Sequence, residues 1–155
     1  MPDSASKEKF PLTALYVEDD NAIRLLTKML LLKKVEKVVL AEDGREGLAL
    51  FHETQPDFVI SDVAMPIMDG MELARKIRET HPNVPIILTT AYDRTDFLLN
   101  AIEIGIDQYL LKPVKQDKLH YVIDKIASAV LAGKRFREQQ RALADMQEQL
   151  QAVLD

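Results

Sequence analysis

Apolar and polar residues follow two different periods along most of this chain. Short runs rich in Val, Ile, Leu and Thr are typical of strands buried on both faces, and longer amphipathic stretches of helical period separate them. The strands are expected at residues 12–17, 38–40, 58–61, 84–90 and 108–111. Regular alternation of strands and helices predicts an α/β fold with a parallel sheet covered by helices on both faces.

The helical stretches have their own start and stop signals. In the first, Asp20 or Asn21 can cap the helix, and Ile23, Leu26 and Leu30 share one apolar face, the kind of face that a surface helix turns to the core. Further helices are expected from Gly44, over residues 71–79 and 96–104, and from a start near Gln116. Five strands and five helices suit a flavodoxin-like, doubly wound (βα)5 fold with strand order 2-1-3-4-5.

The chain divides into three parts by composition. Residues 1–11 are polar and are expected to form a flexible N-terminus, residues 12–132 carry the strand and helix pattern, and residues 133–155 are rich in Gln and charged residues. Apolar residues recur every seven positions into this last part, which predicts a helical, coiled-coil extension. We expect it to be a dimerisation helix or a linker to an output domain outside this sequence. The repeat consists of Val122, Ala129, Phe136, Leu143 and Leu150, joined by Met146 and Val153.

Composition narrows the classes of function. The chain has 155 residues, a formal net charge of −5 and no Cys. The negative charge argues against direct binding of nucleic acid, and the lack of Cys excludes thiol chemistry and disulfides. No apolar run approaches the roughly 18 residues of a membrane span, and residues 1–11 lack the apolar core of a signal peptide. We expect a cytoplasmic protein without a membrane partner.

Acidic residues stand at the ends of two predicted strands. Glu18 and Asp19 follow the first strand, and Asp62 ends the third. In the predicted fold these ends lie side by side, where carboxylates repel one another unless a cation joins them. Mg²⁺ suits such oxygen ligands, and Mn²⁺ could replace it. We expect Asp19 and Asp62 to bind the metal directly and Glu18 to act through a water.

The same arrangement suits phosphoryl transfer. A weakly caged metal leaves Asp62 able to attack a phosphoryl group, and carboxylates are known to form aspartyl phosphates. Lys112 follows the fifth strand and Thr90 ends the fourth, so an ammonium group and a hydroxyl can cover the phosphoryl oxygens.

The motifs together resemble those of response-regulator receiver domains of two-component signalling, the CheY-like family. The resemblance covers roughly residues 12–132. It rests on five features in order, which are Glu18-Asp19, Asp62-x-x-Met65-Pro66-x-Met68-Asp69-Gly70, Thr90-Ala91, Tyr109 and Lys112-Pro113.

The resemblance implies a mechanism and partners. Asp62 would accept a phosphoryl group from a sensor histidine kinase or a phosphotransfer protein, and Asp19, Asp62 and the backbone carbonyl of Ala64 would hold Mg²⁺. Thr90 and Tyr109 would form the switch pair that changes the surface of the fourth helix, fifth strand and fifth helix. That surface and the C-terminal helix could mediate a homodimer. Such a protein catalyses its own phosphorylation and dephosphorylation without being a multiple-turnover enzyme.

Two positions that vary within the family bear on how long the phosphoryl group lasts. Ala64 and Tyr92 lie two residues after Asp62 and Thr90, beside the path of an attacking water. Ala64 has no polar group to orient that water and Tyr92 is bulky, so we expect slow self-dephosphorylation.

Three other classes are weaker alternatives. A phosphatase of the haloacid-dehalogenase type needs a second Asp two residues after the nucleophile, where this chain has Ala64. A flavodoxin-like cofactor binder needs a Ser, Thr or Gly phosphate loop in place of the acidic cluster after the first strand. A pseudo-receiver, acting only as an interaction module, would not need the intact Asp62, Thr90 and Lys112.

Overall fold

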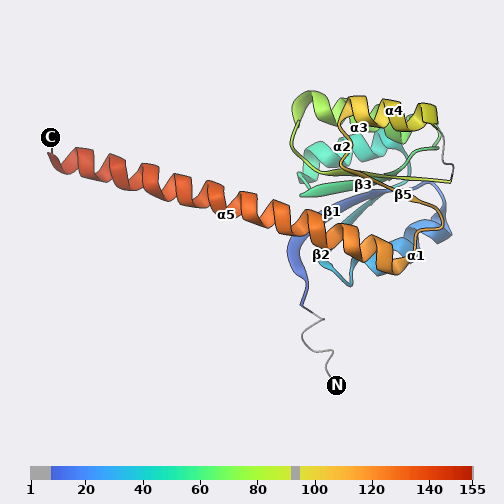
Figure 1. Cartoon of the computed structure of the whole chain (residues 1–155), viewed down its shortest axis with the longest axis horizontal. Coiled ribbons are helices and arrows are strands. Elements are labelled where there is room, and N and C mark those ends of the chain that lie inside the picture. Colours follow the sequence, from blue (N-terminus) through green and yellow to red (C-terminus); the bar gives the residue numbers. More distant parts are fainter. Residues whose placement is uncertain (1–7, 92–94, 155) are drawn as a thin grey trace, which may run out of the picture. The chain divides into compact units, whose positions relative to one another are not determined.

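The computed structural model describes residues 8–91 and 95–154, with only the backbone of residues 95–97. Five strands and five helices alternate along the chain, as the sequence predicted (Figure 1). They are β1 (Phe10–Val17), α1 (Asn21–Leu31), β2 (Val35–Ala41), α2 (Gly44–Thr54), β3 (Phe58–Asp62), α3 (Gly70–Thr80), β4 (Ile86–Thr90), α4 (Thr95–Ile104), β5 (Gln108–Leu111) and α5 (Gln116–Leu154).

The sheet is parallel throughout and has the strand order β2-β1-β3-β4-β5. Figure 1 shows α2, α3 and α4 on one face of the sheet, and α1 with the first turns of α5 on the other. This confirms the predicted doubly wound α/β fold. β1 and β3 are neighbours at the point where the strand order reverses, so their carboxyl ends border the crevice in which such folds bind ligands.

An apolar core forms between the sheet and helices α2 and α3. Every residue of β3 and β4 is buried, as expected for central strands covered on both faces. Leu73 and Ile77, which the sequence placed one helical turn apart on α3, pack in this core with Phe51 of α2. The buried core therefore fixes the strands that end at Asp62 and Thr90.

Helix α1 does not bury the apolar face that its sequence suggested. Ile23 is 38% exposed and Leu26 63% exposed, whereas Arg24, Thr27 and Leu31 are buried. The Arg24 guanidinium Nη1 donates to the backbone carbonyl of Glu18 at 2.7 Å. A hydrogen-bonding requirement at the end of β1 thus sets the rotation of the helix, and hydrophobicity alone gave the wrong face.

Aspartates begin three of the helices. Asp20, Asp43 and Asp69 are N-caps whose carboxylates accept hydrogen bonds from backbone N–H groups three residues later at 2.9, 2.8 and 2.8 Å. Gly70 then brings α3 against the end of β3, since a Cβ at Gly70 would lie 2.2 Å from the Asp62 carbonyl oxygen. The start of α3 and the end of β3 are therefore packed too closely for a side chain.

The chain separates into two compact units, Met1–Ile123 and Asp124–Asp155, and α5 contributes to both. The predicted division into a domain at residues 12–132 and a C-terminal extension stays a prediction. Within the described part of the chain, none of the helices has the length and apolar character that crossing a bilayer requires.

Replacing Gly70 with Ala tests this close approach. The added methyl group must displace backbone atoms of Asp62 or Val63, so we expect Gly70→Ala to lower the free energy of unfolding by about 1–3 kcal/mol in a urea titration. Gly133→Ala is the control, because its Cβ would meet nothing closer than 3.4 Å and alanine favours a helix. Equal losses in the two variants would contradict the proposed packing constraint.

Candidate functional site

Asp62 is the last residue of β3 and the centre of the candidate site. Its side chain is almost buried, and Oδ2 accepts a hydrogen bond from the Lys112 ammonium at 3.0 Å. In the sheet Asp62 lies opposite Thr89 of β4, and the next backbone N–H, of Val63, donates to the Thr89 carbonyl at 3.0 Å. The pairing of β3 with β4 therefore continues to the residue that carries the carboxylate.

Two further carboxylates follow β1 and converge on Asp62. Oxygen atoms of Glu18, Asp19 and Asp62 all lie within 4.8 Å of one another. Glu18 is 1% exposed, whereas Asp19 is exposed, so the cluster has a buried side and a side open to solvent. The structure thus brings together the three acidic residues that the sequence selected.

Lys112 supplies the charge that holds this cluster together. It follows β5, and its Nζ donates to Glu18 Oε1 at 2.8 Å as well as to Asp62. The backbone N–H of Lys112 donates to the Thr90 carbonyl at 2.8 Å, which fixes the end of β5 beside the end of β4. Lys112 is therefore positioned by the sheet, and its side chain bridges the carboxylates from β1 and β3.

The carboxylate of Glu18 is shared among several donors. Besides Lys112, the backbone N–H of Asp20 donates to Oε2 at 3.2 Å, and the Tyr16 hydroxyl lies 3.5 Å from Oε1. Burial raises the pKa of Glu18, an effect that the hydrogen bond from Lys112 opposes. Burial of Lys112 opposes its charged form, but the carboxylates of Glu18 and Asp62 outweigh this and raise the pKa of its ammonium group.

The donor set fits a hard divalent cation. All three converging groups offer carboxylate oxygen, and the exposed side at Asp19 leaves space for the water ligands that Mg²⁺ usually keeps. Ala64 is exposed in the loop after β3, two residues beyond Asp62. Asp19 and Asp62 are thus placed to hold Mg²⁺, with Glu18 behind them.

Two threonines end β4 and differ in their surroundings. Thr90 is the last strand residue and 6% exposed. Thr89 is 2% exposed, and its hydroxyl is the one buried side-chain polar atom without a hydrogen-bond partner among the residues that the structure describes. The sequence favoured Thr90 as the group near the phosphoryl site, and that assignment stays a prediction.

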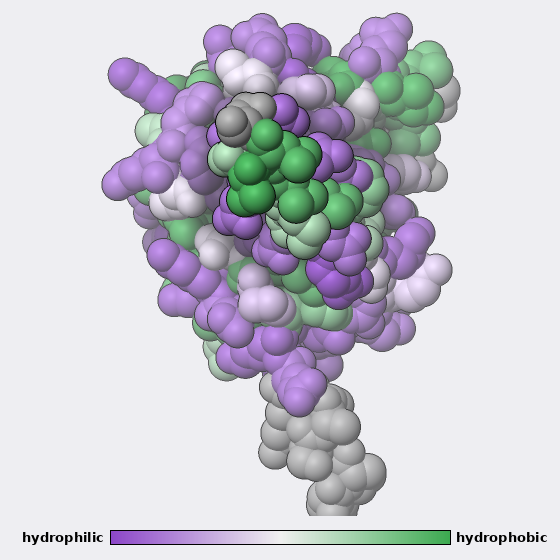
Figure 2. Space-filling view, turned by 90° about the vertical axis from the view of Figure 1, so that its left-hand side faces the viewer, coloured by the Kyte–Doolittle hydropathy of each residue, from purple (hydrophilic) through white to green (hydrophobic). Residues whose placement is uncertain are grey.

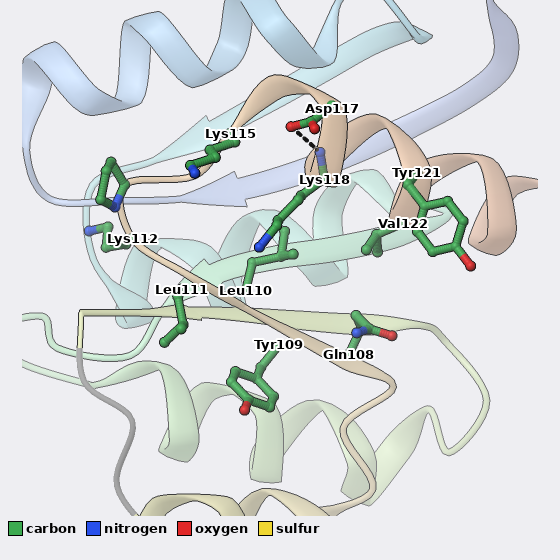
Figure 3. Close-up of a pocket in the computed structure, with 11 residues that line it drawn as sticks. Gln108, Tyr109, Leu110, Leu111, Lys112, Lys115, Asp117, Lys118, Tyr121 and Val122 are labelled. Atoms are coloured by element: carbon green, nitrogen blue, oxygen red, sulfur yellow. Dashed lines mark hydrogen bonds between the residues drawn. The ribbon is translucent and has the colours of Figure 1, made fainter.

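Tyr109 lies in the middle of β5 and is half-buried against the core cluster. In Figure 3, Tyr109 and Leu111 point to one side of β5 and Leu110 to the other, which is the alternation expected of a strand. Tyr109 also lines a groove whose other lining residues include Tyr121 of α5, which is exposed. Tyr92, which we expect to slow self-dephosphorylation, lies outside the described residues.

The sequence did not identify two residues that contact the acidic cluster. Arg24 binds the Glu18 carbonyl, and its position inside an apolar helical stretch, six residues after Glu18, was the available signal. Tyr16 is buried in β1 with its hydroxyl beside Glu18, and burial raises the pKa of the phenol. Nothing in the strand pattern distinguishes Tyr16 from an ordinary core aromatic.

The family model of the response regulator receiver domain matches residues 14–124. The response regulator MprA of Mycolicibacterium vanbaalenii is 38% identical over 109 residues, which are 70% of this chain and 47% of that protein. The transcriptional regulatory protein GlrR of Escherichia coli is 36% identical over 130 residues, 83% of this chain and 29% of that protein. The chain thus spans less than half the length of either relative.

A solved structure shows the same architecture. The chemotaxis protein CheY4 of Vibrio cholerae aligns with a TM-score of 0.70 and 28% identity, covering 75% of this chain and 98% of that one. The chain therefore belongs to the response-regulator receiver family. It contains the receiver domain of a two-component response regulator, as the motifs had indicated.

Mg²⁺ binding at the acidic cluster can be measured through stability. A ligand that binds only the folded state stabilises it by about 2.7 kcal/mol at one hundred times its Kd. We expect MgCl₂ to raise the melting temperature of the wild type, and Asp19→Asn to lose most of this rise because it removes the exposed carboxylate ligand. Glu53→Gln, an exposed acidic residue on α2, should behave as the wild type. A full Mg²⁺ response in Asp19→Asn would contradict the assignment.

Proposed function

We propose that this receiver domain is a phosphoacceptor, in which Asp62 receives a phosphoryl group from a phosphohistidine of a sensor kinase or a phosphotransfer protein. The observation that carries the proposal is the cluster of the Asp62, Glu18 and Asp19 carboxylates, in which Asp62 and Glu18 also pair with the Lys112 ammonium group. Family membership supports the same chemistry.

The proposed reaction uses the groups at the sheet edge in different roles. An Asp62 carboxylate oxygen forms a bond to phosphorus as the bond from phosphorus to the donor imidazole nitrogen breaks, and the electron pair of that bond stays on the imidazole. Mg²⁺, when bound by Asp19 and Asp62, would neutralise charge on the phosphoryl oxygens.

Lys112 and Thr90 complete the proposed cover of the phosphoryl group. Lys112 already contacts the accepting carboxylate, so a small movement of its ammonium group would pair it with a phosphoryl oxygen. The Thr90 hydroxyl would donate to another oxygen, at the end of the strand next to β3. The switch would then follow from movement of Thr90 and Tyr109, which changes the α4-β5-α5 surface and the dimer state.

The main alternative is a phosphatase of the haloacid-dehalogenase type. Such an enzyme would need an acid two residues after Asp62 to protonate the leaving group, and Ala64 cannot do this. The phosphoacceptor proposal needs no such acid, because a phosphohistidine protonated on its second ring nitrogen releases a neutral imidazole. A pseudo-receiver is disfavoured by the Lys112 bridge, which is formed by the residues that phosphoryl transfer requires.

Incubation with acetyl phosphate and Mg²⁺ tests the proposal. We expect intact-protein mass spectrometry to show one added phosphoryl group per chain, because a single carboxylate is placed to accept it. Asp62→Asn should show none, whereas Glu53→Gln should be modified like the wild type. Continuous consumption of acetyl phosphate, with many turnovers per chain, would instead favour the phosphatase.

The lifetime of the phosphorylated state tests the roles of Ala64 and Tyr92. Ala64 has no polar group to orient a water toward the phosphorus and Tyr92 is bulky, so we expect slow release of phosphate. Ala64→Asn combined with Tyr92→Glu should accelerate release about tenfold or more, since a positioned polar group assists attack by water. Phosphate release should be followed after removal of the donor. Faster release from the wild type than from the double variant would refute this explanation.

A further inference from the structure

The C-terminal part of α5 exposes a regular row of large apolar side chains. Within Asp124–Asp155, the described residues with this property are 55–81% exposed and lie three, four or seven positions apart, apart from the final pair. Figure 2 shows hydrophobic surface gathered at the C-terminal end of α5. Exposed apolar rows of this kind mark interaction sites. The residues are Phe136, Leu143, Met146, Leu150, Val153 and Leu154.

All of these residues except Leu154 occupy two positions of one heptad repeat, which we call the seam. Phe136, Leu143 and Leu150 take the first position, and Met146 and Val153 take the second, three residues later. Gln139 is the remaining member of the second position. A 3.5-residue spacing sustained along an exposed helix is the pattern that buries itself against another helix in a left-handed coiled coil.

We propose that the seam pairs with the same seam of a second copy of this chain, as a parallel, in-register coiled coil. The placement of charged residues on this segment favours a second copy of the chain over a charged partner. The charged residues of the segment lie mainly on the outer face, at Arg137, Glu138, Arg141, Asp145 and Glu148. The positions flanking the seam are nearly neutral, so two copies meet without repulsion and a charged partner gains nothing. The flanking residues are Arg135, Gln140, Ala142, Gln147, Gln149 and Leu154.

Gln139 determines the orientation. In a parallel, in-register pair, Gln139 meets Gln139 of the other copy, and the two amides can donate to and accept from each other. In an antiparallel pair centred on the seam, each Gln139 would instead face Leu150. That arrangement buries two amides without partners, at a cost of about 1–3 kcal/mol each. The single polar seam position therefore favours the parallel arrangement.

The paired region is short, so the association is weak. From Phe136 to Val153 the seam covers fewer than three complete heptads, about 25 Å of helix at roughly 1.5 Å per residue. One of its six seam positions, Gln139, is polar. We therefore expect a concentration-dependent equilibrium between monomer and dimer in the unphosphorylated full chain.

Sedimentation velocity over a range of concentrations tests the pairing without any phosphodonor. Leu143→Glu places a charge in the centre of the seam, and should raise the dissociation constant of the dimer about tenfold or more. Ala144→Glu is the matched control, because it adds the same charge on the adjacent outer position and should leave the constant nearly unchanged. Circular dichroism should confirm that both variants keep their helix. A monomeric wild type, or equal effects of the two substitutions, would overturn the proposal.

Cysteine cross-linking tests the orientation, and the natural chain has no Cys to interfere. In the parallel pair, Val153→Cys lies opposite its own copy and should form a disulfide under mild oxidation. In the antiparallel pair those two positions would be about 25 Å apart, far beyond the roughly 7 Å that a disulfide allows. Glu148→Cys, on the outer face, is the control and should form no disulfide under the same conditions.

The antiparallel arrangement predicts a different pattern of disulfide cross-links. A mixture of Phe136→Cys and Val153→Cys chains would form mixed disulfides in that case, while Val153→Cys alone would not. This result, or cross-linking of Glu148→Cys as efficiently as Val153→Cys, would overturn the proposed arrangement. Gln139→Leu should strengthen the dimer and allow both orientations, because it removes the only polar position in the seam.

Discussion

The site depends on one positive charge held between two buried carboxylates. Glu18 follows β1 and Asp62 ends the neighbouring strand β3, and without compensation their charges would repel at close range in a poorly solvated position. The Lys112 ammonium group lies 2.8 Å from one and 3.0 Å from the other, so it joins β5 to β1 and β3 across the edge of the sheet. Because burial makes each charge costly alone, loss of the Lys112 ammonium group would leave both carboxylates uncompensated.

This charge balance explains why the surrounding fold is so closely constrained. The carboxylates can meet the ammonium group only if the strand ends stay level, which the backbone hydrogen bonds from Val63 to Thr89 and from Lys112 to Thr90 ensure. Gly70 brings α3 directly against Asp62, and Arg24 binds the carbonyl of Glu18. Two contacts from helices thus fix the backbone at the carboxylates, while their side chains remain available to a cation.

The sequence predicted most of this arrangement because strand ends are visible in it. Buried strands are visible as short apolar runs, and parallel pairing places their final residues at one edge of the sheet. Asp62, Asp19 and Lys112 could therefore be assigned to one site from the sequence. The rotation of α1 could not be predicted, because Ile23 and Leu26 look like core residues until Arg24 is seen to satisfy a carbonyl at the end of β1. The contact of Tyr16 with Glu18 was missed although residues two apart in an extended strand share one face, because a buried tyrosine in an apolar run looks like an ordinary core residue.

The weakness of the proposed coiled coil matters for signalling. A site can change a distant association only by its coupling free energy, which is commonly about 1–3 kcal/mol. A long, wholly apolar coiled coil would stay dimeric whatever happened at Asp62, because such a coupling could not shift its equilibrium. A seam that is shorter than three heptads and contains Gln139 makes the free energies of monomer and dimer more nearly equal. The polar residue that specifies orientation therefore also keeps the association within the range that phosphorylation could control.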